Sequence, residues 1–100
     1  MAKTGKKDQF TELDPATLLN TAEVQAEAIT EAFESGDAGL IAHTIGLVAR
    51  SRGMTSVAEE TGIARPSLYR ALSQDGNPRL NSLVEIFAAL NIKIEAKISA

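Results

Sequence analysis

The sequence predicts an all-α fold of five to six helices that ends in one short C-terminal β-strand. Three observations lead to this prediction. Apolar residues recur at helical spacing through most of the chain, glycine separates the helical stretches, and apolar and charged residues alternate only after residue 91. With 100 residues, of which 44% are hydrophobic, the chain suits one small domain with a single core.

The composition excludes several classes of protein. The chain has no cysteine, so it can hold neither a disulfide nor a thiolate metal site. No apolar run is long enough to cross a bilayer, and the first residues lack the apolar part of a signal peptide. We therefore expect a cytoplasmic protein with no membrane partner, no cofactor, no metal and no small-molecule ligand. His43 is the only histidine, and no cluster of nucleophile and base stands out, so we do not expect an enzyme.

Charge is distributed unevenly, although the net charge is only −3. Residues 1–9 contain three lysines and are expected to form a disordered basic tail. Residues 10–37 are expected to form an acidic helical segment, since no lysine or arginine occurs between residues 8 and 37. Residues 38–80 contain five arginines and three acidic residues. An acidic part joined to a basic part favours two surfaces with different partners, although an ordinary solvated acidic face explains the pattern equally well.

The acidic segment is predicted to contain a short helix and a longer one. Asp14 can cap a helix that starts at Pro15, and Thr21 can open a second helix that Ser35-Gly36 ends. The apolar residues of the second helix share helical spacing and are expected in the core: Ala22, Ala26, Ile29, Ala32 and Phe33. Its opposite face is acidic: Glu23, Glu27, Glu31 and Glu34. Like charges four residues apart destabilise a helix by roughly 0.2 to 0.5 kcal/mol per pair, which a basic protein partner would relieve.

A central core helix is predicted for residues 38–51, with Asp37 as its cap. Its apolar stripe is wide: Leu40, Ile41, Thr44, Ile45, Val48 and Ala49. Gly46 costs about 1 kcal/mol relative to alanine and therefore indicates close packing against another helix. Arg50 and Arg52 suit the end of this helix, where they could also reach phosphate, and Gly53 stops it.

Two short helices joined by a glycine turn are predicted next. Thr55 is expected to cap a first helix over residues 56–61, and Gly62 to leave it with a positive φ. Pro66 suits the first turn of a second helix that runs from about residue 65 to residue 73. This arrangement is a helix-turn-helix, and it places a DNA-binding domain within residues 38–91.

The second short helix is expected to read DNA, because the early part of this helix enters the major groove in a helix-turn-helix. Its outward side chains are Arg65, Ser67, Tyr69 and Arg70. Arginine can bind guanine edges or phosphate, and serine or tyrosine can do so more weakly. The alternative is a helical hairpin that binds no DNA and whose arginines are merely solvated.

The DNA backbone is expected to contact residues beside this helix: Thr55, Asn77 and Arg79. The last two lie in a loop over residues 74–79 that is dense in turn formers, where Gly76 would expose an N–H and permit a tight bend. Alternatively, Asn77 only satisfies its own turn.

The last helix is predicted over residues 82–90, with Asn81 as its cap and a core stripe of four residues: Leu83, Ile86, Phe87 and Leu90. Residues 92–98 then alternate between apolar and charged residues, which is typical of a strand. A single strand needs a partner, and we expect the same strand of a second copy in a homodimer. Antiparallel pairing about Ala96 would set Ile94 opposite Ile98 and Glu95 opposite Lys97. Alternatively, this segment folds against its own domain.

Residues 10–98 resemble the HigA-like addiction-module antitoxins, most specifically in the sequence GIARPSLYRALSQDGNP. The resemblance implies an Xre/Cro-type, lambda-repressor-like helix-turn-helix and places Arg65, Ser67, Tyr69 and Arg70 at DNA-facing positions. It also implies that a dimer binds a double-stranded DNA operator, represses its own operon and neutralises a RelE/ParE-like toxin, typically a ribosome-dependent mRNA-cleaving enzyme. Pro66 and Ala71 depart from the pattern, which leaves the operator sequence open.

We place the toxin contact on the acidic helix, at Glu23, Glu27, Glu31 and Glu34. Two other functions remain as alternatives. The chain would then be a stand-alone transcriptional regulator without a toxin partner, or a helical adaptor that binds only protein.

Overall fold

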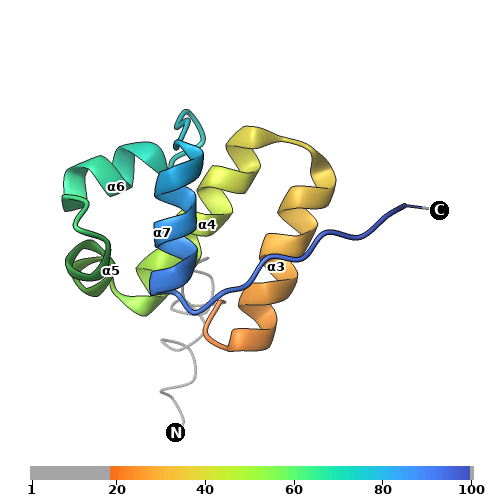
Figure 1. Ribbon diagram of the computed structural model, residues 1–100, viewed down its shortest axis with the longest axis horizontal. Helices are drawn as coiled ribbons and strands as arrows, with labels where there is room; N and C mark the ends of the chain where they lie inside the picture. The colour runs from red at the N-terminus through yellow and green to blue at the C-terminus, as the bar shows by residue number, and fades with distance from the viewer. Residues whose placement is uncertain (1–18, 100) are drawn as a thin grey trace, which may run out of the picture.

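The computed structural model describes residues 19–99, and this part of the chain folds into five helices (Figure 1). The helices are α3 (Ala22–Ser35), α4 (Ala38–Arg52), α5 (Met54–Thr61), α6 (Arg65–Ala71) and α7 (Leu80–Ala89). The all-α prediction is confirmed for these residues. The predicted basic tail and the helix predicted at Asp14-Pro15 lie outside the described residues.

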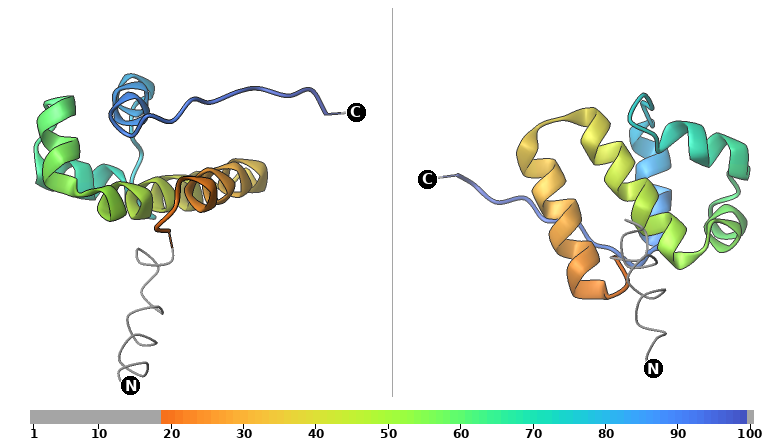
Figure 2. Two further views of the ribbon diagram at one scale, coloured as in Figure 1. Left: turned by 90° about the horizontal axis from the view of Figure 1, so that it is seen from below. Right: turned by 180° about the vertical axis from the view of Figure 1, so that it is seen from behind.

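α3 and α4 lie antiparallel in one layer, with α5 and α6 beyond α4 on the side away from α3 (Figures 1 and 2). The predicted ends of α3 are confirmed. The Thr21 hydroxyl accepts a hydrogen bond from Val24 N at 3.2 Å, and Gly36 ends the helix in the left-handed region with a φ of 72°. Asp37 caps α4 as predicted, because its Oδ1 accepts from Gly39 N and Leu40 N at 2.9 and 3.2 Å.

The predicted core of α3 is only partly correct. Ile29 and Ala32 are buried, but Ala22 and Ala26 are exposed and Phe33 keeps 41% of its surface exposed. The structure instead buries the polar Gln25, which is 4% exposed. The buried face of α3 is therefore narrower than its apolar spacing predicted, and it includes the amide side chain of Gln25.

α5 and α6 are joined by a tight turn at Gly62, as predicted. Gly62 has a φ of 75°, and its N–H donates to the Ala58 carbonyl at 2.9 Å. Thr55 does not cap α5, so that prediction is wrong. The helix begins one residue before Thr55, at Met54, directly after Gly53. The Met54 side chain is buried in the core, and Thr55 is exposed within the first turn of the helix.

α6 ends two residues earlier than predicted, at Ala71, and α7 begins earlier than predicted, at Leu80. Asn81 is therefore inside α7 rather than its cap. Its Oδ1 accepts only from the neighbouring Ser82 N, and no side chain caps this helix. α7 lies on one side of the layer formed by α3 and α4, as the left view of Figure 2 shows.

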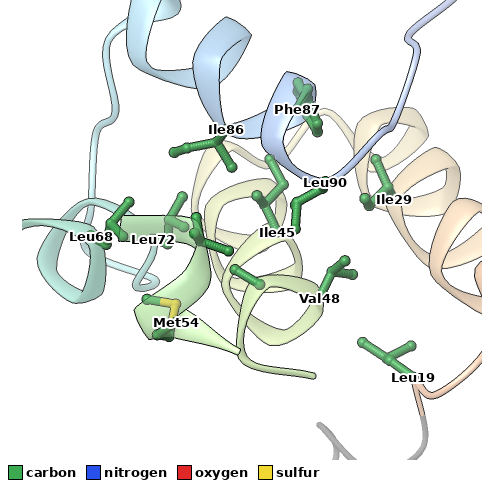
Figure 3. Packing of buried hydrophobic residues seen from close by; sticks show 12 residues of the cluster. Leu19, Ile29, Ile45, Val48, Met54, Leu68, Leu72, Ile86, Phe87 and Leu90 are labelled. Carbon is green, nitrogen blue, oxygen red and sulfur yellow. The ribbon is translucent and has the colours of Figure 1, made fainter. Parts of the chain in front are cut away.

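The core contains side chains from all five helices, and α5 contacts α4, α6 and α7 around it (Figure 3). Its largest fully buried side chains belong to α4, α6 and α7 or to the end of α7: Ile45, Val48, Leu68, Ile86 and Leu90. The close packing predicted at Gly46 is confirmed. A Cβ there would collide with the Leu72 carbonyl oxygen and lie 3.1 Å from Leu72 Cβ.

The predicted C-terminal strand is not formed in this structure, so that prediction is wrong for the single chain. After Ile92 N donates to the Phe87 carbonyl at 2.9 Å, residues 93–99 run as an irregular segment that crosses over α3 in Figure 1 and stands away from the α3–α4 layer in Figure 2. The physical reason is that a strand needs a second strand for its hydrogen bonds, and residues 19–99 supply none.

Candidate nucleic-acid interface

α6 has an apolar inner face and a charged outer face. Leu68 is fully buried and Leu72 is 5% exposed, so these two leucines hold the helix against the core. Arg65 and Arg70 are exposed on the outside, and Ser67 is half-buried. Arg70 Nη2 donates a hydrogen bond to Ser67 Oγ at 3.3 Å, so the structure brings two of the four predicted reading residues together.

Tyr69 occupies a different side of α6 from Arg70. It is 45% exposed and lines a cavity of about 180 Å³ between α6 and α4, together with His43, Arg50 and Ser73. The sequence placed Arg50 at the end of α4, but the helical pattern alone did not show that it lies beside Tyr69. An exposed arginine of α4 therefore shares this cavity with Tyr69.

The residues predicted to contact the DNA backbone are all exposed: Thr55, Asn77 and Arg79. We predicted that Gly76 would expose its N–H, but this prediction is wrong. The Gly76 N–H donates to the Ser73 carbonyl at 2.9 Å. Gly76 instead permits a close approach, since a Cβ there would collide with the Ala71 carbonyl. The loop is thereby held against the end of α6.

Arg52, which we expected could also reach phosphate, is exposed but makes hydrogen bonds within the protein. Its Nε donates to Gln25 Oε1 at 2.9 Å and its Nη1 donates to the Leu90 carbonyl at 2.8 Å. Gln25 Nε2 donates in turn to the Leu19 carbonyl at 2.7 Å and to Ser51 Oγ at 3.0 Å. This network joins α3, α4 and the end of α7, and the sequence pattern gave no sign of it.

The described residues hold no group of three or more histidine, cysteine, aspartate or glutamate side chains that could bind a metal ion. Within the same residues, no helix is long and apolar enough to cross a membrane.

Residues 9–98 match a family described as probable addiction module antidote proteins. The chain belongs to this antidote family. It is also 32% identical over 90 residues to an uncharacterized protein from Haemophilus influenzae, and the match covers 90% of this chain and 93% of that one. No solved structure matches the chain. Membership supports the antitoxin role that the resemblance implied and implies a toxin of some kind as partner, whereas the HigA and Xre/Cro assignments stay predictions.

The four glutamates predicted to contact the toxin lie on a different helix from the predicted DNA-reading residues. Glu23, Glu27, Glu31 and Glu34 are all exposed on α3, and α4 lies between α3 and the α5–α6 pair (Figure 1). The structure therefore places the predicted toxin surface and the predicted DNA surface on opposite sides of α4.

The residues predicted to form the dimer are open to solvent in the single antidote chain. Ile94 is 53% and Ile98 is 96% exposed, and Ala96 is also exposed. None of the three contributes to the core, so these side chains are available to a second molecule.

Proposed function

We propose that this antidote is a sequence-specific DNA-binding antitoxin that represses its own operon as a homodimer and neutralises a RelE/ParE-like toxin. The observation that carries the DNA-binding part is the arrangement of α6. Two buried leucines fix this helix, while Arg65 and Arg70 project from its outer side. This is the geometry that a recognition helix of an Xre/Cro-type helix-turn-helix needs to enter a major groove.

In the proposed complex, Arg65 and Arg70 bind base edges, because an arginine guanidinium can donate two hydrogen bonds to guanine. The hydrogen bond between Arg70 and Ser67 is exposed and 3.3 Å long, so Arg70 can exchange it for a contact with a base. Thr55, Asn77 and Arg79 contact phosphates on either side of α6, and Arg50 beside Tyr69 adds a further phosphate contact. The two α6 helices of a dimer would then lie roughly 34 Å apart, to meet successive major grooves.

The toxin-binding part of the proposal rests on the antidote family and on the charge of α3. Four exposed glutamates lie on one helix, and no basic residue occurs in that helix. A basic surface on the toxin would relieve their mutual repulsion. The proposal gives the antidote no enzymatic activity of its own.

Binding to the promoter DNA of the chain's own operon tests the first part. Arg65→Ala and Arg70→Ala should each weaken binding to this DNA by about 1 to 3 kcal/mol, with a smaller loss on random DNA of equal length. Arg79→Ala is the matched control, because a phosphate contact should weaken both DNAs equally and reduce the salt dependence by about one counterion. Binding that does not weaken as salt rises would contradict the proposal.

Co-purification with the toxin tests the second part. Reversal of Glu23, Glu27, Glu31 and Glu34 to lysine should abolish co-purification and leave operator binding intact. Glu59→Lys together with Glu60→Lys is the control, because both residues are exposed acids on α5. Intact co-purification of the α3 variant would exclude α3 as the toxin surface.

A further inference from the structure

An apolar stripe runs along the outside of α7. Leu80 is 76% and Val84 is 61% exposed, and Ala88 is also exposed. These three residues recur every four positions and so lie on one side of the helix, which is not the side that buries Phe87. We call them the α7 stripe. A large contiguous apolar patch on a domain surface is typical of a contact site, so the extent of this stripe decides its meaning.

The α7 stripe continues into the C-terminal segment, residues 92–99. A hollow of about 490 Å³ is lined by Val84 and Ala88 of the stripe together with Ile92 and Ile94. A second hollow, of about 580 Å³, lies between the segment and α3, where it is lined by Ile29 and the half-exposed Phe33 together with Ile94 and Ile98. Ile94 lines both hollows, so apolar side chains continue from α7 across the C-terminal segment to α3. Charged side chains also line the second hollow: Glu34, Lys93, Glu95 and Lys97. Figure 2 shows how α7, this segment and α3 are arranged.

We propose that this surface binds a second copy of the chain, with the two C-terminal segments paired as antiparallel strands that cover the α7 stripes and Phe33. The proposal deepens the homodimer of the proposed function and rests on it. A two-stranded ribbon alone is only marginally stable in water. Apolar support from α7 and α3 is therefore what would make the pairing stable.

Charge complementarity selects a second copy as the occupant. Antiparallel pairing about Ala96 sets Glu95 opposite Lys97 of the other copy, twice by symmetry, and keeps the isoleucines on one face. Pairing about Glu95 would instead set Glu95 opposite its own equivalent and Lys93 opposite Lys97. A pairing that set odd residues opposite even ones would turn the isoleucines of the two strands to opposite faces. Pairing about Ile94 also sets unlike charges opposite each other, Lys93 against Glu95, and an exchange of charge between Glu95 and Lys97 distinguishes it from pairing about Ala96.

Sedimentation equilibrium of the full chain tests the surface. Val84→Glu should weaken the dimer by about tenfold or more, because it places a carboxylate in an apolar contact. Val24→Glu is the matched control. It is the same substitution at an exposed valine on α3 that does not line either hollow, and it should leave the dimer unchanged.

Exchanging the charges of Glu95 and Lys97 tests which residues of the two strands lie opposite each other. Both side chains are exposed, so their replacement leaves the core intact. Glu95→Lys should weaken the dimer by setting like charges opposite each other, and adding Lys97→Glu should restore it. A wild-type chain that sediments as a monomer would overturn the inference, as would a dimer that is insensitive to Val84→Glu or a double variant that fails to recover.

The same variants separate this inference from the rest of the proposed function. Sedimentation needs neither DNA nor toxin, so a dimer that responds as described supports the surface even if the chain fails to bind its operator. If the wild-type chain is monomeric and Val84→Glu abolishes toxin co-purification, the stripe belongs to the toxin and the dimer surface is overturned.

Discussion

α3 and α6 both turn charged faces outward, but they are attached to the rest of the protein in different ways. α6 is held by Leu68 and Leu72, which are apolar and almost entirely buried. α3 is held partly by Ile29 and partly by the hydrogen bonds of Gln25, which reach Leu19, Ser51 and Arg52. The comparison shows that the attachment of α6 does not depend on polar groups, whereas that of α3 requires several donors and acceptors to stay satisfied.

Leu68→Ala should have the largest effect on stability, because it opens a cavity at a fully buried site under α6. We expect the free energy of unfolding to fall by about 2 to 5 kcal/mol, measured by urea denaturation. Leu40→Ala is the matched control, since Leu40 is 39% exposed and should cost clearly less. Equal losses at the two leucines would mean that α6 is not held mainly by apolar burial.

Gln25→Leu should have an intermediate effect, because it keeps the approximate size of the side chain but leaves its hydrogen-bond partners unsatisfied. The Leu19 carbonyl and Arg52 Nε would both lose a partner, for a loss of about 1 to 3 kcal/mol in the free energy of unfolding. Gln74→Leu, at an exposed glutamine in the loop after α6, is the control.

A double-mutant cycle sharpens this prediction. If Gln25 acts mainly through Arg52, then Gln25→Leu should cost less in a chain that also carries Arg52→Met. Additive losses would show that the contacts with Leu19 and Ser51 carry the effect instead.

Arg70→Ala should have the smallest effect on stability, within about 0.5 kcal/mol, because it removes only one exposed hydrogen bond, to Ser67. The measurement is the same urea denaturation. A larger loss would mean that α6 depends on its outer face after all, and weaker DNA binding by this variant could then reflect unfolding.

Much of the fold could be predicted from local signals. Thr21, Gly36, Asp37 and Gly62 mark helix ends through caps or a left-handed φ, and each of these assignments is confirmed because such signals depend on a few neighbouring atoms. Gly46 was correctly predicted to mark a close contact, although the sequence could not name Leu72 as the neighbour.

The errors lie where partners come from distant parts of the chain. Apolar spacing placed Ala22, Ala26 and Phe33 in the core, but the helices available to cover α3 leave that side open. Gln25 and Arg52 are polar, so only the packing of α3 against α4 shows that they bond to each other. The alternating pattern after residue 91 describes a strand whose partner is absent from a single chain.

The candidate site was predicted in outline rather than in geometry. The exposure of Arg65 and Arg70 agrees with the helical pattern of α6. That Tyr69 and Arg50 line one cavity could not be predicted, because it depends on how α6 crosses α4.

The contact between Gly46 and Leu72 separates the orientation of α6 from the identity of its outer residues. Because the main chain of Gly46 lies against the main chain of Leu72, side chains that face solvent do not determine how α4 and α6 cross. Mutations on the outer side of α6 can therefore accumulate while the helix keeps its direction. Related chains could in this way diverge in the partner they recognise and retain one architecture.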